Sequence, residues 1–153
     1  MCIRDRHYAR VIKQRLTDQY KQQWHTDLES SDRYTTFRTF KHEHKREGYL
    51  TEIKVTKYRK LFTRLRLGIT ELNNNKKYTQ PDKTRICPFC SEIEDEEHFL
   101  LICPKYNSLR HKYISRHWIS LNAVQTNDLL NDHYPHISLS VALYIDRALK
   151  RRE

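Results

Sequence analysis

Three cysteines and a histidine lie close together in this sequence, with a spacing that suits metal binding. Cys87 and Cys90 are followed by His98 and Cys103, which gives the pattern C-x2-C-x7-H-x4-C. Two sulfurs from one tight turn can bind the same cation, and an imidazole and a third sulfur complete a tetrahedron. Zinc prefers these soft donors, and four protein ligands leave no open position for a substrate. We therefore predict a structural Zn2+ site.

Two alternatives to a metal site stay open for this cluster. The first is a set of buried reduced cysteines beside a surface histidine, although three of the four cysteines share one short window with turn-forming Pro88. The second is a disulfide, which would leave one of these three cysteines unpaired, and no stretch resembling a secretory signal precedes them. If His98 is not the fourth ligand, His111 is the next candidate.

The composition favours helices and a negatively charged partner. Only two glycines occur in 153 residues, which argues against glycine-rich phosphate loops and dinucleotide-binding motifs. The 29 basic and 19 acidic residues give a formal net charge of +10, and such a surplus favours binding to nucleic acid. The longest apolar stretch, Ile137 to Ile145, is interrupted by serines and is too short to span a bilayer, so we expect no membrane partner.

Hydrophobic periodicity predicts a mainly α fold. Apolar residues recur at three- and four-residue steps from Tyr8 to Leu28 and again from Val55 to Ile69. We also expect a short strand over 85–89, a helix over 94–102 that Pro104 ends, a helix over 105–118 and two final helices. The predicted organisation is a non-native leader over 1–6, a basic helical region over 7–80, a small zinc-stapled CCHC minidomain over 85–118 and C-terminal helices over 119–153.

The helix predicted from Val55 to Ile69 combines an apolar face with cations. It contains no acidic residue, whereas a helix surface that serves solubility alone usually mixes both signs. We therefore expect its polar face to bind phosphates. The acidic run from Glu92 to Glu97 is expected to be exposed at a helix N-terminus, which directs a nucleic acid to other surfaces. The predicted nucleic-acid-binding residues are Lys57, Arg59, Lys60, Arg64, Arg66, Arg110 and Lys112.

The residues around the cluster resemble a known family. The runs 85–90, 92–101 and 103–106, followed by Leu109-Arg110, are similar to the C-terminal zinc-binding segment of non-LTR (LINE-type) retrotransposon reverse transcriptases. The likeness is specific in these runs and looser back to Trp24. It implies that the three cysteines of the cluster and His98 are zinc ligands. It also implies a role in binding template RNA or target DNA during reverse transcription.

The catalytic parts of that family are missing from this sequence. Two-metal phosphoryl transfer needs clustered acidic residues, and the sequence holds no adjacent Asp-Asp pair and no room for a polymerase palm. We therefore predict no enzymatic activity. Our prediction is an intracellular nucleic-acid-binding zinc module, a C-terminal piece of a reverse transcriptase whose partners are RNA, DNA and the rest of that polypeptide. The first alternative is a zinc-folded protein–protein interaction module. The second, a catalytic zinc enzyme, would need an open coordination position.

Overall fold

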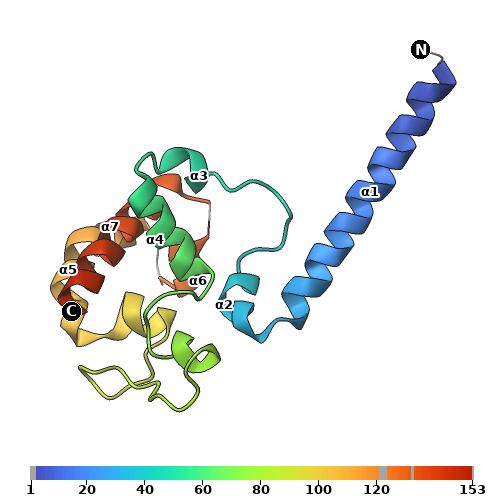
Figure 1. The fold of residues 1–153 in the computed structure, drawn as a ribbon. Helices are drawn as coiled ribbons and strands as arrows, with labels where there is room; N and C mark the ends of the chain where they lie inside the picture. Colours follow the sequence, from blue (N-terminus) through green and yellow to red (C-terminus); the bar gives the residue numbers. More distant parts are fainter. Residues whose placement is uncertain (1–2, 121–123, 132, 153) are drawn as a thin grey trace.

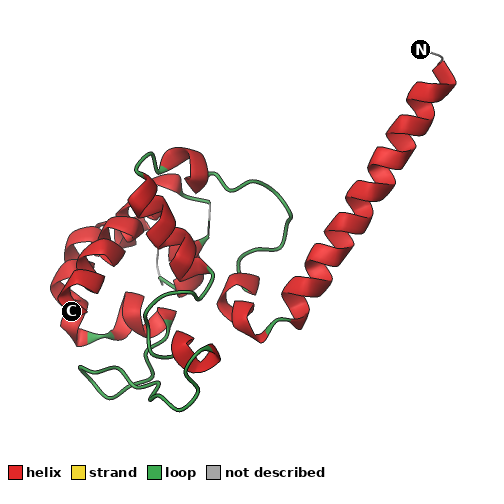
Figure 2. Cartoon of the chain, in the orientation of Figure 1, coloured by secondary structure: helices red, strands yellow, loops and turns green. Residues whose placement is uncertain are grey.

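Helices make up nearly all of the regular structure, which confirms the predicted mainly α fold (Figure 1, Figure 2). The structure is a computed structural model that describes residues 3–120, 124–131 and 133–152. The α-helices are α1 (Ile3–Ser30), α2 (Thr35–Arg38), α3 (Tyr49–Glu52), α4 (Thr56–Arg66), α5 (Asn107–Tyr113), α6 (Thr126–Leu130) and α7 (Pro135–Arg152). Short 3-10 helices span Asp32–Tyr34, Asn75–Tyr78, Pro104–Tyr106 and Ser115–Ser120, and a π-helix spans His98–Ile102.

The long helix α1 extends away from the rest of the chain (Figure 1). Its periodic apolar residues Ile12, Leu16 and Tyr20 are more than half exposed, and from residue 6 onward Leu28 is the first apolar side chain that is buried. The helix begins at Ile3, inside the segment 1–6 that we expected to have no place in the fold. Residues 1 and 2 lie outside the described residues.

The helix α4 packs as its sequence predicts, although it is shorter than the periodic stretch. Phe62 and Leu65 are buried on its apolar face, and α7 is its main neighbour. Gly68 follows the helix with a φ of 63°, a left-handed conformation that favours glycine after a helix C-terminus. A Cβ at this position would lie 3.4 Å from the carbonyl oxygen of Arg33, which is van der Waals contact, so the backbone conformation is what favours glycine here.

The core is built around α7. Its residues Val141, Tyr144, Ile145 and Ala148 are fully buried, and α3, α4, α5 and α6 pack against it. The buried residues of the cysteine-containing segment belong to the same continuous core, namely Cys87, Phe99, Leu100, Cys103 and Tyr106. The segment that we predicted as a small zinc-stapled minidomain therefore packs against α7 and shares its core.

Two predicted elements differ from the structure in form. The strand expected over 85–89 is reduced to one antiparallel bridge between Ile86 and Ile93. The described residues contain no strand beyond this single bridge. The helix expected over 105–118 is divided into a 3-10 turn, α5 and a second 3-10 segment. The two final helices are confirmed as α6 and α7. No helix in the described parts of the chain combines the length and apolarity needed to cross a membrane.

Candidate metal centre

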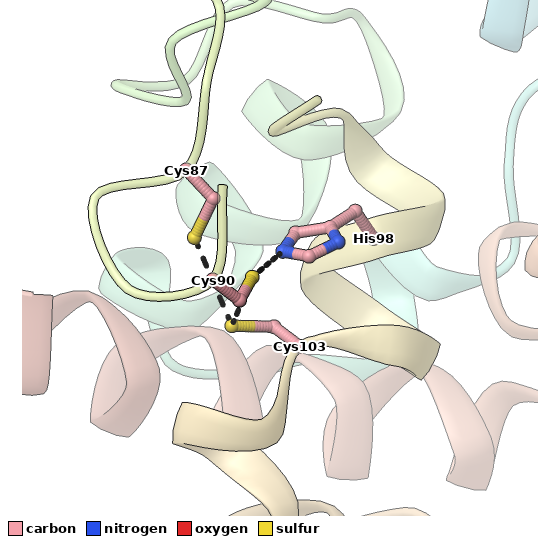
Figure 3. A group of neighbouring side chains, drawn as sticks. All are labelled: Cys87, Cys90, His98 and Cys103. Atoms are coloured by element: carbon pink, nitrogen blue, oxygen red, sulfur yellow. Dashed lines mark hydrogen bonds between the residues drawn. The ribbon is translucent and has the colours of Figure 1, made fainter. Parts of the chain in front are cut away.

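The structure brings the four predicted ligands together (Figure 3). One donor atom from each of Cys87, Cys90, His98 and Cys103 lies within 4.8 Å of all the others. The Cys103 sulfur is 3.9 Å from that of Cys87 and 4.0 Å from that of Cys90, and His98 Nε2 is 3.2 Å from the Cys90 sulfur. A tetrahedral ion with metal–sulfur bonds of about 2.3 Å holds its sulfurs about 3.8 Å apart. The group therefore fits a Cys3His metal site.

These distances also argue against the disulfide alternative. A disulfide needs sulfurs about 2.05 Å apart, and the three described cysteines are free thiols. The alternative ligand His111 is an exposed residue of α5 and does not belong to the group. His98, by contrast, is buried. Cys2 lies outside the described residues.

A tight backbone loop holds the first two cysteines. The Cys87 N–H donates to the Glu92 carbonyl at 2.7 Å, and the Glu94 N–H donates to the Arg85 carbonyl at 2.9 Å. These bonds flank the Ile86–Ile93 bridge and close the loop on itself. Ser91 turns the chain back with a φ of 62°, which is a strained conformation for a residue with a side chain. The loop geometry thus depends on local backbone bonds rather than on a sheet.

Two of the cysteines share a local motif in which proline follows cysteine. Burial raises the pKa of the Cys87 thiol, and a hydrogen bond from the Phe89 backbone N–H opposes this rise. Burial likewise raises the pKa of Cys103 to about 12, and the Lys105 N–H acts against it in the same way. In both places the N–H two residues after the cysteine points at the sulfur. Such bonds stabilise the thiolate that a metal ion requires.

The π-helix explains how His98 and Cys103 reach the same ion. In an α-helix, residues five apart are rotated by about 140° and point in different directions. The i→i+5 hydrogen bonds of a π-helix widen the turn, so residues five apart come closer to one face. The Cys103 N–H donates to the His98 carbonyl at 2.8 Å, which is the bond expected for this geometry. Pro104 then ends the helix, as the sequence predicted.

Arg110, which we predicted as a nucleic-acid contact, is buried next to the backbone of the metal group. It is 5% exposed, and its guanidinium donates to the carbonyl oxygens of Leu100 and Cys103 at 2.8 and 2.9 Å. These carbonyls lie at the C-terminal end of the π-helix, where helical bonding leaves acceptors without partners. Arg110 therefore has a structural role.

Arg66 was also predicted to bind nucleic acid and is instead 2% exposed in the core. Its guanidinium donates to Glu47 at 2.9 Å. Four aromatic rings surround it at 4.8 to 5.7 Å, those of Phe37, Phe40, Tyr49 and Phe62. The flat, weakly hydrated guanidinium suits such stacking. Arg66 therefore lies on the buried face of α4, together with Phe62 and Leu65.

The remaining predicted cations lie at or near the surface. Lys60 is exposed, and Lys112 is exposed with its ammonium 5.3 Å from the Tyr113 ring. Arg64 is exposed and lies 3.8 Å from Glu71. Lys57 forms an ion pair at 2.5 Å with the buried Asp146 of α7. The half-buried Arg59 donates to the Leu50 carbonyl at 3.0 Å, so Lys57 and Arg59 take part in packing as well.

The acidic run is partly internal, contrary to the expectation that it is exposed. Glu94 and Glu96 are 1% and 5% exposed. Glu94 accepts hydrogen bonds from Arg152 near the end of α7 at 2.8 and 2.9 Å, and from the Asn73 N–H at 2.7 Å. The bonds with Glu94 raise the pKa of Arg152. Sequence reasoning missed this link because no local pattern connects residues 58 positions apart.

The chain was also compared with known proteins. Searches of protein-family models, curated proteins and solved structures found no match to it. The resemblance to retrotransposon reverse transcriptases therefore stays a hypothesis that rests on the residues of the cysteine segment. The geometry of the four ligands stands independently of that hypothesis.

Proposed function

We propose that this chain is a nucleic-acid-binding module that folds around one structural Zn2+ ion. The observation that carries the zinc part is the convergence of three sulfurs and one imidazole nitrogen within 4.8 Å. Soft thiolates select zinc over magnesium or calcium, and four protein ligands leave no site for a reacting group. The proposal therefore includes no catalytic step. The ion would instead stabilise the core that the cysteine segment shares with α7.

The surface charge supports a nucleic-acid partner. The excess cations are not hidden in the core, because the described buried residues of the two charge signs are equal in number. Among the described charged residues, three cations and three anions are buried, so the surplus of ten positive charges stays with the other residues. A surface of this sign releases counterions when it binds phosphates. The buried residues are Lys41, Arg66 and Arg110 on one side and Glu94, Glu96 and Asp146 on the other.

The exposed face of α4 is the best candidate for phosphate contact. Lys60 and Arg64 lie one turn apart on this helix, and α4 itself contains no acidic residue. Backbone-directed contacts of this kind give affinity with little sequence preference. The similarity of residues 85–110 to the zinc-binding segment of LINE-type reverse transcriptases supports the same role, as a C-terminal piece of such a protein. That role requires an intracellular location in the nucleus or cytoplasm.

A salt titration tests the proposal. The zinc-loaded chain would be titrated into fluorescent 20-nucleotide RNA and DNA, single- and double-stranded, between 50 and 500 mM NaCl. We expect affinity that falls linearly on a log–log plot, with a slope of about −0.9 per phosphate contact on duplex DNA. An absence of binding to all four probes at 50 mM NaCl would refute the nucleic-acid part and leave the zinc part intact.

Variants locate the binding surface. The double variant Lys60→Gln with Arg64→Gln should weaken binding and reduce the size of the salt slope by about 2, because two phosphate contacts are lost. A matched control replaces the exposed Lys83 and Arg147 by Gln, which removes the same charge elsewhere. Equal losses in both variants would show that the surface charge acts diffusely and that α4 is not the contact. Lys57 is left unchanged because its replacement would leave the buried Asp146 without this ion pair.

A protein–protein interaction module is the second candidate, and one observation favours it. Ile86, Ile93 and Ile102 beside the metal group are 40%, 54% and 57% exposed. Exposed apolar residues grouped around a rigid centre are typical of protein contacts. The two candidates differ in salt dependence, since an apolar interface loses little affinity between 50 and 500 mM NaCl.

A further inference from the structure

The helix α1 presents a row of apolar side chains that is left largely uncovered in the described parts of the chain. We call this row the α1 stripe: Tyr8, Ile12, Leu16 and Tyr20, which are 64%, 56%, 60% and 61% exposed. Residues four apart lie on one face of a helix, so the stripe is continuous. An open groove follows it to His44, whose ring is 5.0 Å from that of Tyr20. Scattered apolar residues are normal on surfaces, but a continuous row marks an interaction site.

The charges of α1 indicate what covers the stripe. The segment from His7 to Arg15 contains three basic residues and no acidic one, while Leu16 to Ser30 contains three acidic residues and one lysine. This order opposes the helix dipole, which favours anions near the N-terminus and cations near the C-terminus. The arrangement therefore does not serve an isolated helix. It does suit an antiparallel copy of the same helix, because each basic half then faces an acidic half. A parallel copy would bring like charges together.

The accessible surface of the chain is also larger than that expected for a compact monomer of the same mass. Its accessible surface is 10170 Å² for a mass of 18.7 kDa. A compact monomer of this mass exposes about 8,300 Å² by the usual scaling of surface with mass. The difference is about 1,900 Å². The longest helix, α1, projects from the rest of the chain and so adds to the exposed surface (Figure 1). A stable interface needs about 800 Å² from each partner, so the excess is sufficient for one.

We propose that two copies of this chain associate through an antiparallel pairing of their α1 stripes. A two-fold axis near Leu16 places Leu16 opposite the partner's Leu16 and Ile12 opposite the partner's Tyr20, because the stripe residues are equally spaced on either side. The interface is isologous, so every contact occurs twice. At physiological salt the charges act over about 8 Å, so the complementary halves of α1 outweigh the net charge of the more distant parts.

The oligomeric state tests this inference directly. We expect the zinc-loaded chain to sediment in analytical ultracentrifugation as a dimer with twice the mass of the 18.7 kDa chain. Leu16→Lys places two like charges at the centre of the interface and should raise the dimer dissociation constant by about 100-fold or more. The control Gln14→Lys adds the same charge on the opposite face, where Gln14 contacts only Asp18 of its own helix in the described bonds, and should leave the dimer intact. A wild-type chain that is monomeric at 100 µM would overturn the inference.

Cross-linking tests the orientation. In a Cys2→Ser background, Ile12→Cys and Tyr20→Cys variants are oxidised mildly with zinc bound, separately and as a mixture. The antiparallel arrangement predicts a disulfide between the two variants in the mixture and none in either variant alone. Cross-links within each variant alone would instead show a parallel pair and overturn the inference. Since the readout needs no nucleic acid, its outcome is independent of the proposed function.

Discussion

Replacing Arg66 should lower the stability of the protein without acting through a ligand. Its guanidinium donates to Glu47 at 2.9 Å and lies within 6 Å of four ring centroids. Breaking a buried ion pair by removing one partner costs about 3–5 kcal/mol. Glu47 keeps Lys41 as a second partner, so we take the lower part of that range. Loss of the cation–π contacts of a desolvated guanidinium adds about 1–2 kcal/mol. We therefore expect Arg66→Ala to lower the free energy of unfolding by about 4 kcal/mol.

The assay is urea unfolding of the zinc-loaded protein, followed by circular dichroism at 25 °C. Arg64→Ala is the matched control, since Arg64 lies two residues earlier on the same helix with its side chain 53% exposed. It should change the unfolding free energy by no more than about 0.5 kcal/mol. Arg66→Lys keeps the charge but loses the flat surface that stacks on rings, and we expect a loss of about 2 kcal/mol.

The nucleic-acid assay should give the opposite ranking under conditions where every variant is folded. Arg64→Ala should then reduce affinity for RNA or DNA, and Arg66→Ala should leave it unchanged. If Arg66→Ala costs less than about 1 kcal/mol, or no more than Arg64→Ala, the guanidinium does not hold the core in the way its contacts indicate.

Three further predictions concern the metal group. Removing the metal with a chelator should abolish the near-UV dichroism of the core, because structural zinc binding is worth about 10–16 kcal/mol against a net stability of about 5–15 kcal/mol; an unchanged Tm after verified removal would contradict this. Zinc affinity should fall as the pH falls, since burial raises the pKa of Cys87 and Cys103 and each thiol must release a proton before it binds. Because two protons are released, the zinc dissociation constant measured by chelator competition from pH 6 to 8 should rise by about 100-fold or more for each pH unit lost. Ser91→Gly should stabilise the zinc-loaded protein by about 0.5–1 kcal/mol in urea unfolding, because glycine relieves the φ of 62°; Ser91→Ala, which keeps the Cβ, should be neutral.

The ligands could be found from the sequence because the chemistry of the site is local. Cys87 and Cys90 lie in one turn, and His98 and Cys103 lie on one helical segment that proline ends. Residue type and spacing were therefore sufficient. The π-helical turn was not predicted, because its hydrogen bonding depends on the partners that its backbone carbonyls find later in the chain. Two of those carbonyls are held by Arg110, which follows ten and seven residues later.

The roles of the arginines could not be read in the same way. On α4, Arg64 and Arg66 have the same charge and nearly the same neighbours in sequence, yet one is in solvent and the other is enclosed by rings. A two-residue step turns a helix by about 200°, so the two side chains must point in different directions. Which of the two side chains is buried depends on Glu47, Phe37 and Phe40, which contact Arg66 but lie outside α4 in the sequence. Charge counts therefore overestimated how many of these cations are exposed.

The helix α1 shows a third situation, in which the pattern was correct and its interpretation was incomplete. A four-residue apolar period predicts a helix with one face that needs to be covered. The structure leaves Ile12 and Leu16 exposed instead. An apolar period shows which face of a helix must be buried. It does not show whether the residues that bury this face belong to the same chain or to another molecule. The charge order of α1 supplies the missing information, because it is unfavourable for the helix alone and favourable for an antiparallel copy. If the cross-linking experiment finds that copy, the apolar stripe and the reversed charges have a single physical cause.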